Sequence, residues 1–152
     1  MYLDAKNEFS DAQAVTSTAI SSNVIDLGAT NTLKDIGTGQ DVYLVVSTQT
    51  AATDSGSDAT LTVTLESDST ANLATSATVH FSTGALAFAA FSPAGTVLAA
   101  VKLPAGNYER YVGVRYTVAS GPLTAGKFDA FLTTDVQAWR AYADNVTILA
   151  AA

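Results

Sequence analysis

The chain has 152 residues, of which 48% are hydrophobic and 14% are charged, and it carries a formal net charge of −7 at pH 7. This length and hydrophobic content suit one folded domain with its own core and exclude a disordered polyelectrolyte. The acidic balance repels phosphate backbones and anionic lipid, so we expect neither nucleic acid nor a membrane as a partner. The sequence has no cysteine, which excludes disulfides, thiolate metal sites and a cysteine nucleophile.

The N-terminal segment, residues 1–12, shows no strand period. It combines Tyr2, Leu3 and Phe9 with several charged residues, a composition that suits an arm ordered against a partner. Acidic residues stand where a secretory signal would need a basic end followed by an apolar run. We therefore expect no export signal, an arm over residues 1–12 and a single β-sandwich domain over residues 13–152.

Short β-type runs recur along the chain, separated by clusters of Gly, Ser, Thr, Asp and Pro, and this spacing is typical of a sandwich or barrel. Residues 60–65 alternate between threonine and apolar residues, which predicts a strand with one core face, whereas residues 42–46 are apolar on both faces, as expected of a central strand. A helical turn is possible over residues 86–91, before Pro93. The pattern predicts an all-β fold, a two-sheet jelly-roll-like sandwich, with strands near residues 13–20, 23–27, 42–48, 60–66, 76–82, 96–102, 108–118 and 127–134.

The stretch NYERYVGVRYTV, residues 107–118, carries aromatic and cationic side chains on both faces of a predicted strand. Alternation gives one apolar core face, and the other face shows Tyr111 and Arg115 where a half-buried strand would show small polar groups. Arg110 falls on the core face. Either it lies near the strand end and extends its guanidinium to water, or a bulge at Gly113 shifts the alternation.

Turn residues in ASGPLTAG separate this strand from KFDAFLTTD, which predicts that the two strands pair as a hairpin. Arg115 would then lie opposite Asp129, with Phe131 beside them. Tyr, Phe, Trp and Arg are enriched where a partner buries a surface, which favours an interface on this face. An exposed strand or packing within the sandwich is an equal alternative on residue types alone. The predicted interface residues are Tyr2, Leu3, Phe9, Tyr111, Arg115, Asp129, Phe131, Trp139, Arg140 and Tyr142.

Reactive sites are only weakly indicated. His80, the single histidine, could serve a Ser-His-Asp triad, but an ordinary strand histidine is the better interpretation because a triad is defined by its geometry. Asp54 and Asp58 could approach a calcium ion, yet their spacing lacks the acidic series of an EF-hand loop, and an acidic hairpin tip fits better. We therefore expect no enzyme activity, no cofactor and no metal.

Four parts of the sequence resemble the capsid cement, or decoration, proteins of tailed bacteriophages: MYLDAKNEFSDAQAVT, IDLG, KDIGTGQDVYLVV and, above all, LPAGNYERYVGVRYTVASGPLTAGKFDAFLTTDVQ. The resemblance implies a non-enzymatic jelly-roll protein on the outer surface of an icosahedral virion. Such a protein clamps neighbouring major capsid subunits against internal DNA pressure, often as a homodimer. An acidic, cysteine-free, unexported sandwich also suits assembly in the bacterial host cytoplasm.

The main alternative function is a carbohydrate-binding jelly-roll module, because tyrosine and tryptophan faces also stack on sugars. That function would need an exposed aromatic platform in a monomer. The cement function instead places the same aromatic residues between chains, against the major capsid protein or a second copy.

Overall fold

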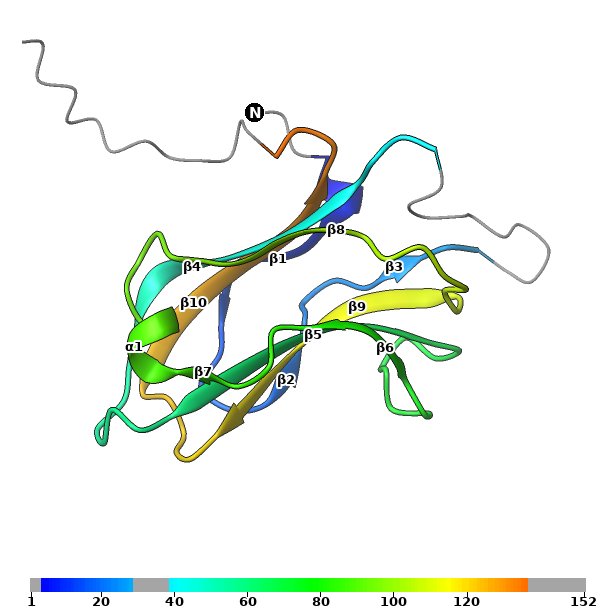
Figure 1. The fold of residues 1–152 in the computed structure, drawn as a ribbon. Helices are drawn as coiled ribbons and strands as arrows, with labels where there is room; N and C mark the ends of the chain where they lie inside the picture. Colours follow the sequence, from blue (N-terminus) through cyan, green and yellow to red (C-terminus); the bar gives the residue numbers. More distant parts are fainter. Residues whose placement is uncertain (1–3, 29–38, 137–152) are drawn as a thin grey trace, which may run out of the picture.

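In a computed structural model of the protein, residues 4–28 and 39–136 are described, and they form two antiparallel sheets packed face to face as a sandwich (Figure 1). The all-β sandwich prediction is confirmed. One sheet has the strand order β1-β10-β4-β8, and the other has the order β2-β9-β5-β6, with β3 on β9 and β7 on β5. The elements are η1 (Ala5–Asn7), β1 (Glu8–Ala14), β2 (Ala19–Ile20), β3 (Ile25–Asp26), β4 (Tyr43–Thr53), β5 (Thr60–Asp68), β6 (Thr78–Ser82), β7 (Leu86–Ala87), α1 (Phe88–Phe91), β8 (Val97–Lys102), β9 (Tyr111–Ala119) and β10 (Ala125–Thr133).

The core fills the space between the two sheets. The alternation predicted for β5 is confirmed, because its apolar residues are fully buried while the intervening threonines are partly exposed. Strand β4 lies between β10 and β8, which confirms its central position. Each fully buried aliphatic or aromatic side chain contributes about 1.5–3 kcal/mol. The largest of these side chains are Tyr116, Phe9, Phe91, Phe128, Leu44, Leu61, Leu65 and Leu73.

The predicted helical turn is present as α1, which lies between β7 and β8. Phe91 is fully buried there, and the Ser92 N–H donates a hydrogen bond of 2.9 Å to the Phe88 carbonyl. Pro93 follows at once, and proline cannot continue a helix. In the described part of the chain, no helix is long and apolar enough to cross a membrane.

The beginning of the sandwich differs from the prediction. Residues 8–14 form β1, which pairs with β10, and the predicted strand at residues 13–20 is divided between β1 and the short β2 in the other sheet. Phe9 is fully buried in the core, so the part of the expected arm from Glu8 onward belongs to the sheet. Register shifts in β1 and a positive φ of 46° at Ala12 interrupt the regular strand period, which is why alternation does not reveal this strand.

The predicted hairpin is wrong. β9 pairs with β2, β3 and β5, whereas β10 pairs with β1 and β4, so the connecting loop crosses from one sheet to the other. Leu123 is buried within that loop, and its N–H donates to the Thr16 carbonyl at 2.9 Å. The connection between β4 and β5 also joins the two sheets and is no hairpin tip. Turn residues mark both connections correctly, but they carry no information about which sheet the next strand enters.

Candidate interaction surface

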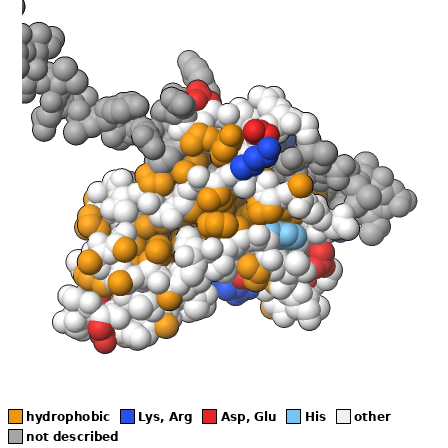
Figure 2. All heavy atoms as spheres, viewed as in Figure 1, with side chains coloured by type: hydrophobic (Ala, Val, Ile, Leu, Met, Phe, Trp, Pro, Cys, Tyr) orange, Lys and Arg blue, Asp and Glu red, His pale blue; other side chains and the backbone are white. Residues whose placement is uncertain are grey.

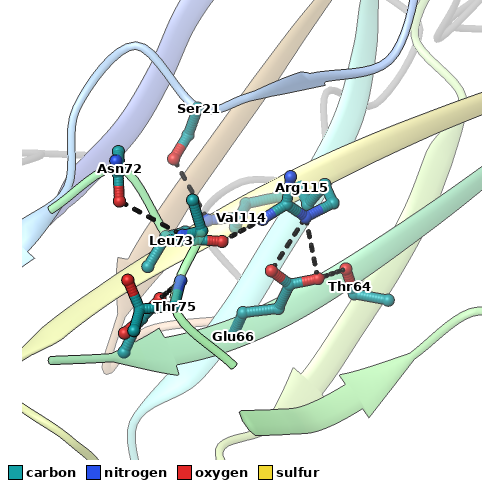
Figure 3. Close-up of polar contacts among 10 residues, drawn as sticks. Ser21, Thr64, Glu66, Asn72, Leu73, Thr75, Val114 and Arg115 are labelled. Carbon is teal, nitrogen blue, oxygen red and sulfur yellow. Dashed lines mark hydrogen bonds and ion pairs between the residues drawn. The ribbon is translucent and has the colours of Figure 1, made fainter. Parts of the chain in front are cut away.

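The outer face of β9 is covered by other parts of the same chain. Arg115 lies opposite Thr64 of β5 and Ile20 of β2, not opposite Asp129. Its Nε donates to the buried Glu66 carboxylate at 2.9 and 3.1 Å, and its Nη2 donates to the Leu73 carbonyl at 2.6 Å. In Figure 3 the Arg115 side chain lies between Glu66 and Leu73. The Nε and Nη2 donors of Arg115, expected at an interface, are therefore engaged by residues of the same chain.

Glu66 was not found by sequence reasoning, although it completes this cluster. Its Oε1 also accepts a hydrogen bond of 2.7 Å from the Thr64 hydroxyl (Figure 3). The side chain of Glu66 is 7% exposed and that of Arg115 is 28% exposed. A carboxylate this deeply buried is costly unless it is paired and hydrogen-bonded. The sequence shows only a glutamate directly after the alternating apolar run of β5. This pattern does not identify the residue that pairs with the glutamate.

Residues 69–77, between β5 and β6, form the loop that covers β9. Asp68 is fully buried and organises this loop by accepting hydrogen bonds from the N–H groups of Thr75, at 2.7 Å, and Thr70, at 3.2 Å. Burial raises the pKa of the Asp68 carboxyl, but these hydrogen bonds together with Ser69 outweigh it, so the pKa lies below its ordinary value. The loop thereby holds Leu73, which is itself buried, against β9.

Gly113 is the point of closest approach between β9 and its cover. A Cβ at this position would lie 2.8 Å from Leu73 Cδ1 and 3.3 Å from both the Ser21 hydroxyl and Val24 Cγ2. The Ser21 hydroxyl also accepts a hydrogen bond of 3.1 Å from the Val114 N–H (Figure 3). The glycine therefore allows two separate segments to cover the strand, and it does not mark a bulge, because the pairing of β9 with β5 has no register shift.

An exposed arginine lies just before β9. Arg110 precedes the strand, which agrees with the strand-end alternative, and its guanidinium makes two hydrogen bonds to Asp26 at 2.9 and 2.8 Å. The same guanidinium lies 4.8 Å from the centre of the Tyr111 ring, a cation–π distance. Tyr111 is half-buried. We call Asp26, Arg110 and Tyr111 the β9 corner. Asp26 had not been singled out, because its position beside Arg110 depends on the pairing of β3 with β9.

The remaining predicted interface residues have different positions. Phe131 is almost fully buried on β10, and Asp129 is partly exposed and accepts a hydrogen bond of 2.7 Å from the Ala12 N–H. Burial, with smaller contributions from the Asp11 and Asp129 charges, raises the pKa of Glu8. Asp129 and Phe131 thus help to hold β1 against β10. Tyr2, Leu3, Trp139, Arg140 and Tyr142 lie outside the described residues.

His80 contacts Ser67 and Tyr108. Its Nε2 lies 2.7 Å from the Ser67 hydroxyl, and its ring stacks on Tyr108 with the ring centres 4.0 Å apart. Ser67 is fully buried and also accepts a hydrogen bond of 3.0 Å from the Glu109 N–H. Burial lowers the pKa of His80 and outweighs the opposite effect of the Glu109 charge. The contacts hold the loop between β8 and β9, and a serine without exposed surface is badly placed to attack a substrate.

Asp54 closes the connection between β4 and β5. One of its carboxylate oxygens accepts hydrogen bonds of 3.1 Å from the N–H groups of Asp58 and Ala59. These bonds, the one from Ala59 first, lower the pKa of Asp54. Within the described residues, no group of three or more histidine, cysteine or acidic side chains is placed to hold a metal ion.

These features define an all-β protein whose described polar clusters fasten loops and strands to one another. The sequence profile of the Bbp16 family matches residues 9–132. The matched region runs from Phe9 in β1 to Leu132 in β10 and therefore includes both sheets. The chain belongs to this bacteriophage-related family. No curated protein matches the sequence.

Proposed function

We propose that this protein is a structural component of the virion, which binds the outer surface of an icosahedral phage capsid and cements neighbouring major capsid subunits against internal pressure. Its partners in this function are the major capsid protein and a second copy of itself. It acts without catalysis, cofactor or metal. The observation that carries the proposal is the match to the phage-related Bbp16 family across the whole sandwich, together with the resemblance of the sequence to phage cement proteins.

One end of the sandwich is the best candidate for contact with the shell. The beginning of β4 and the ends of β8 and β10 lie at this end, because Tyr43 pairs with both Thr133 and Lys102. The Leu103 N–H bonds to the Val42 carbonyl there. Figure 1 shows β3 and the beginning of β9 at the same end, toward the right of the view. The β9 corner is therefore part of this end.

The predicted interface residues of both termini connect to this end through the chain. Asp4 precedes η1 and β1, and β1 begins beside Phe131 near the end of β10. Residues 134–136 follow β10 directly. In the proposed function, Tyr2, Leu3, Trp139, Arg140 and Tyr142 add contacts to neighbouring subunits. Many such weak contacts, repeated over a lattice, give firm attachment by multivalency.

The carbohydrate-binding alternative finds less support. It requires an exposed aromatic platform, and among the described residues the large hydrophobic side chains that are exposed are Val79 and Val97, which are not aromatic. Tyr111, the aromatic residue of the β9 corner, is half-buried beside Arg110.

Co-sedimentation with expanded phage shells that lack their cement protein tests the proposal. Wild type is expected to bind saturably. Arg110→Ala, which removes a charge at the β9 corner, should weaken binding about tenfold, as loss of an interface hot spot does. Lys127→Ala removes the same charge from the opposite end of β10 and should bind like wild type. A wild type that fails to bind any shell and is retained on a glycan array would refute the proposal.

A further inference from the structure

Strand β8 has an open edge. Within residues 4–28 and 39–136, β8 is the last strand of its sheet and pairs only with β4. In Figure 1 its other side carries no neighbouring strand of the same sheet. A strand edge of this kind presents a row of unpaired N–H and C=O groups to another chain.

Ala100, in the middle of β8, points its backbone groups to this edge. The Leu103 N–H donates to the Val42 carbonyl at 2.9 Å, which fixes the pair of Leu103 and Val42 as hydrogen-bonded. Hydrogen-bonded and non-hydrogen-bonded pairs alternate along an antiparallel ladder. Ala100, which lies opposite Val45, is therefore in a non-hydrogen-bonded pair with β4. Its N–H and C=O must point away from β4, toward the open edge.

Apart from Lys102 at its end, the edge of β8 has little of the usual protection. Natural edge strands carry charges, prolines or bulges that discourage pairing. β8 has one register shift, near Leu98, and the four residues after it are regular. Residues 97–101 are uncharged, and Val97 is 39% exposed. The opposite edge of this sheet, β1, has two register shifts and carries Glu8 and Asp11.

Charge favours a second copy of the chain as the occupant. Two chains of net charge −7 repel each other over most of their surfaces. Lys102, the one charged residue of β8, forms an ion pair of 2.5 Å with Asp41, and the two charges offset each other. Two copies can therefore approach along β8 with little electrostatic cost.

We propose that β8 pairs antiparallel with β8 of a second copy, about a two-fold axis that passes beside Ala100. Each Ala100 then exchanges both backbone hydrogen bonds with its counterpart, and the small side chains allow close approach. Ala99 lies opposite Val101 of the other copy on the core side, so the two four-stranded sheets become continuous. Figure 2 shows hydrophobic side chains gathered along the opening between the sheets, and the second copy would cover part of this surface. The inference deepens the proposed function and rests on it for the role of the dimer.

Single-cysteine cross-linking of the free protein tests this pairing, on a background that contains no native cysteine. In a hydrogen-bonded antiparallel pair the Cα atoms are about 5.5 Å apart, a separation that a disulfide can span. Ala100→Cys should form a covalent dimer under mild oxidation. Val79→Cys, at an exposed position on β6, should not. Equal cross-linking of the two variants, or none with Ala100→Cys, would overturn the proposal.

A second pair of variants measures the strength of the pairing. Ala100→Lys places like charges opposite each other and should raise the dimer dissociation constant at least tenfold, by analytical ultracentrifugation. Ala51→Lys makes the same charge change at an exposed position on β4 and should leave the constant within about twofold. Equal changes in the dissociation constant for the two variants would contradict the pairing of β8 with β8. Because neither assay contains a shell, loss of shell binding with an intact β8 dimer would instead contradict the proposed function.

Discussion

Leu73 Cδ1 lies where a Cβ on Gly113 would need space, at a separation of only 2.8 Å. Gly113→Ala should therefore destabilise the protein by about 1–3 kcal/mol, because the buried Leu73 side chain must move within packed surroundings to make room. Urea unfolding measures this change. Gly106→Ala is the matched control, since nothing lies within 4 Å of the added carbon, and it should change stability by less than about 0.5 kcal/mol. Equal stability of the two variants would show that the loop yields freely.

The Arg115–Glu66 pair should show strong energetic coupling. Arg115→Met leaves a buried carboxylate without its cation and should cost about 2–4 kcal/mol, while the double variant with Glu66→Leu should cost less than the sum of the two single changes. A double-mutant cycle gives the coupling, expected at about 1–3 kcal/mol. The exposed Lys102–Asp41 pair provides the comparison and should couple by less than about 1 kcal/mol. Similar coupling energies in the two pairs would contradict the conclusion that burial strengthens the Arg115–Glu66 pair.

His80 should make stability depend on pH. Its pKa is lower in the folded chain than the ordinary value of 6.5, so folding favours the neutral ring. The resulting stabilisation is complete above about pH 6.5 and is lost as the pH falls through the folded-state pKa. Urea unfolding between pH 5 and pH 8 should show this loss, and His80→Gln should flatten the profile.

Glu8 provides an internal contrast to His80. Its pKa is raised from 4.5, so its contribution is present at low pH and decreases as the pH rises. A wild-type protein that loses stability from pH 5 toward pH 7, in the manner of Glu8, would contradict the assignment of the pH dependence to His80.

Phe9 should behave as a core residue. Phe9→Ala removes a fully buried aromatic side chain and should lower stability by about 3–5 kcal/mol. Deletion of residues 2–3 should leave stability unchanged, because it ends before η1 and β1. Thermal unfolding distinguishes the two variants. If the Phe9→Ala protein were as stable as wild type but bound shells more weakly, Phe9 would belong to the partner-binding arm and not to the core.

Local pattern predicted the strands better than their partners. The alternation of β5, the central position of β4 and the turn at α1 depend on neighbouring residues, and all three were correct. The β9–β10 hairpin was wrong because ASGPLTAG suits a return within one sheet as well as a crossing to the other. The loop that covers β9 is polar and has a single buried residue, Leu73. One apolar residue forms no periodic pattern, so the sequence did not reveal this contact. Tyr111 and Arg115 were correctly recognised as unusual for a solvent-facing strand, but for Arg115 the cause is a contact within the chain.

The crossing between β9 and β10 also bears on how the protein folds. Each of these consecutive strands has neighbours on both sides, and the two lie in different sheets. Strands of the two sheets alternate along the chain, and most of the required pairings join distant parts of it. Such a topology is expected to give slow folding, on the order of milliseconds to seconds, and a single domain of this size is expected to unfold in a single step. We therefore expect both sheets of a chain of this kind to form together, as one cooperative unit.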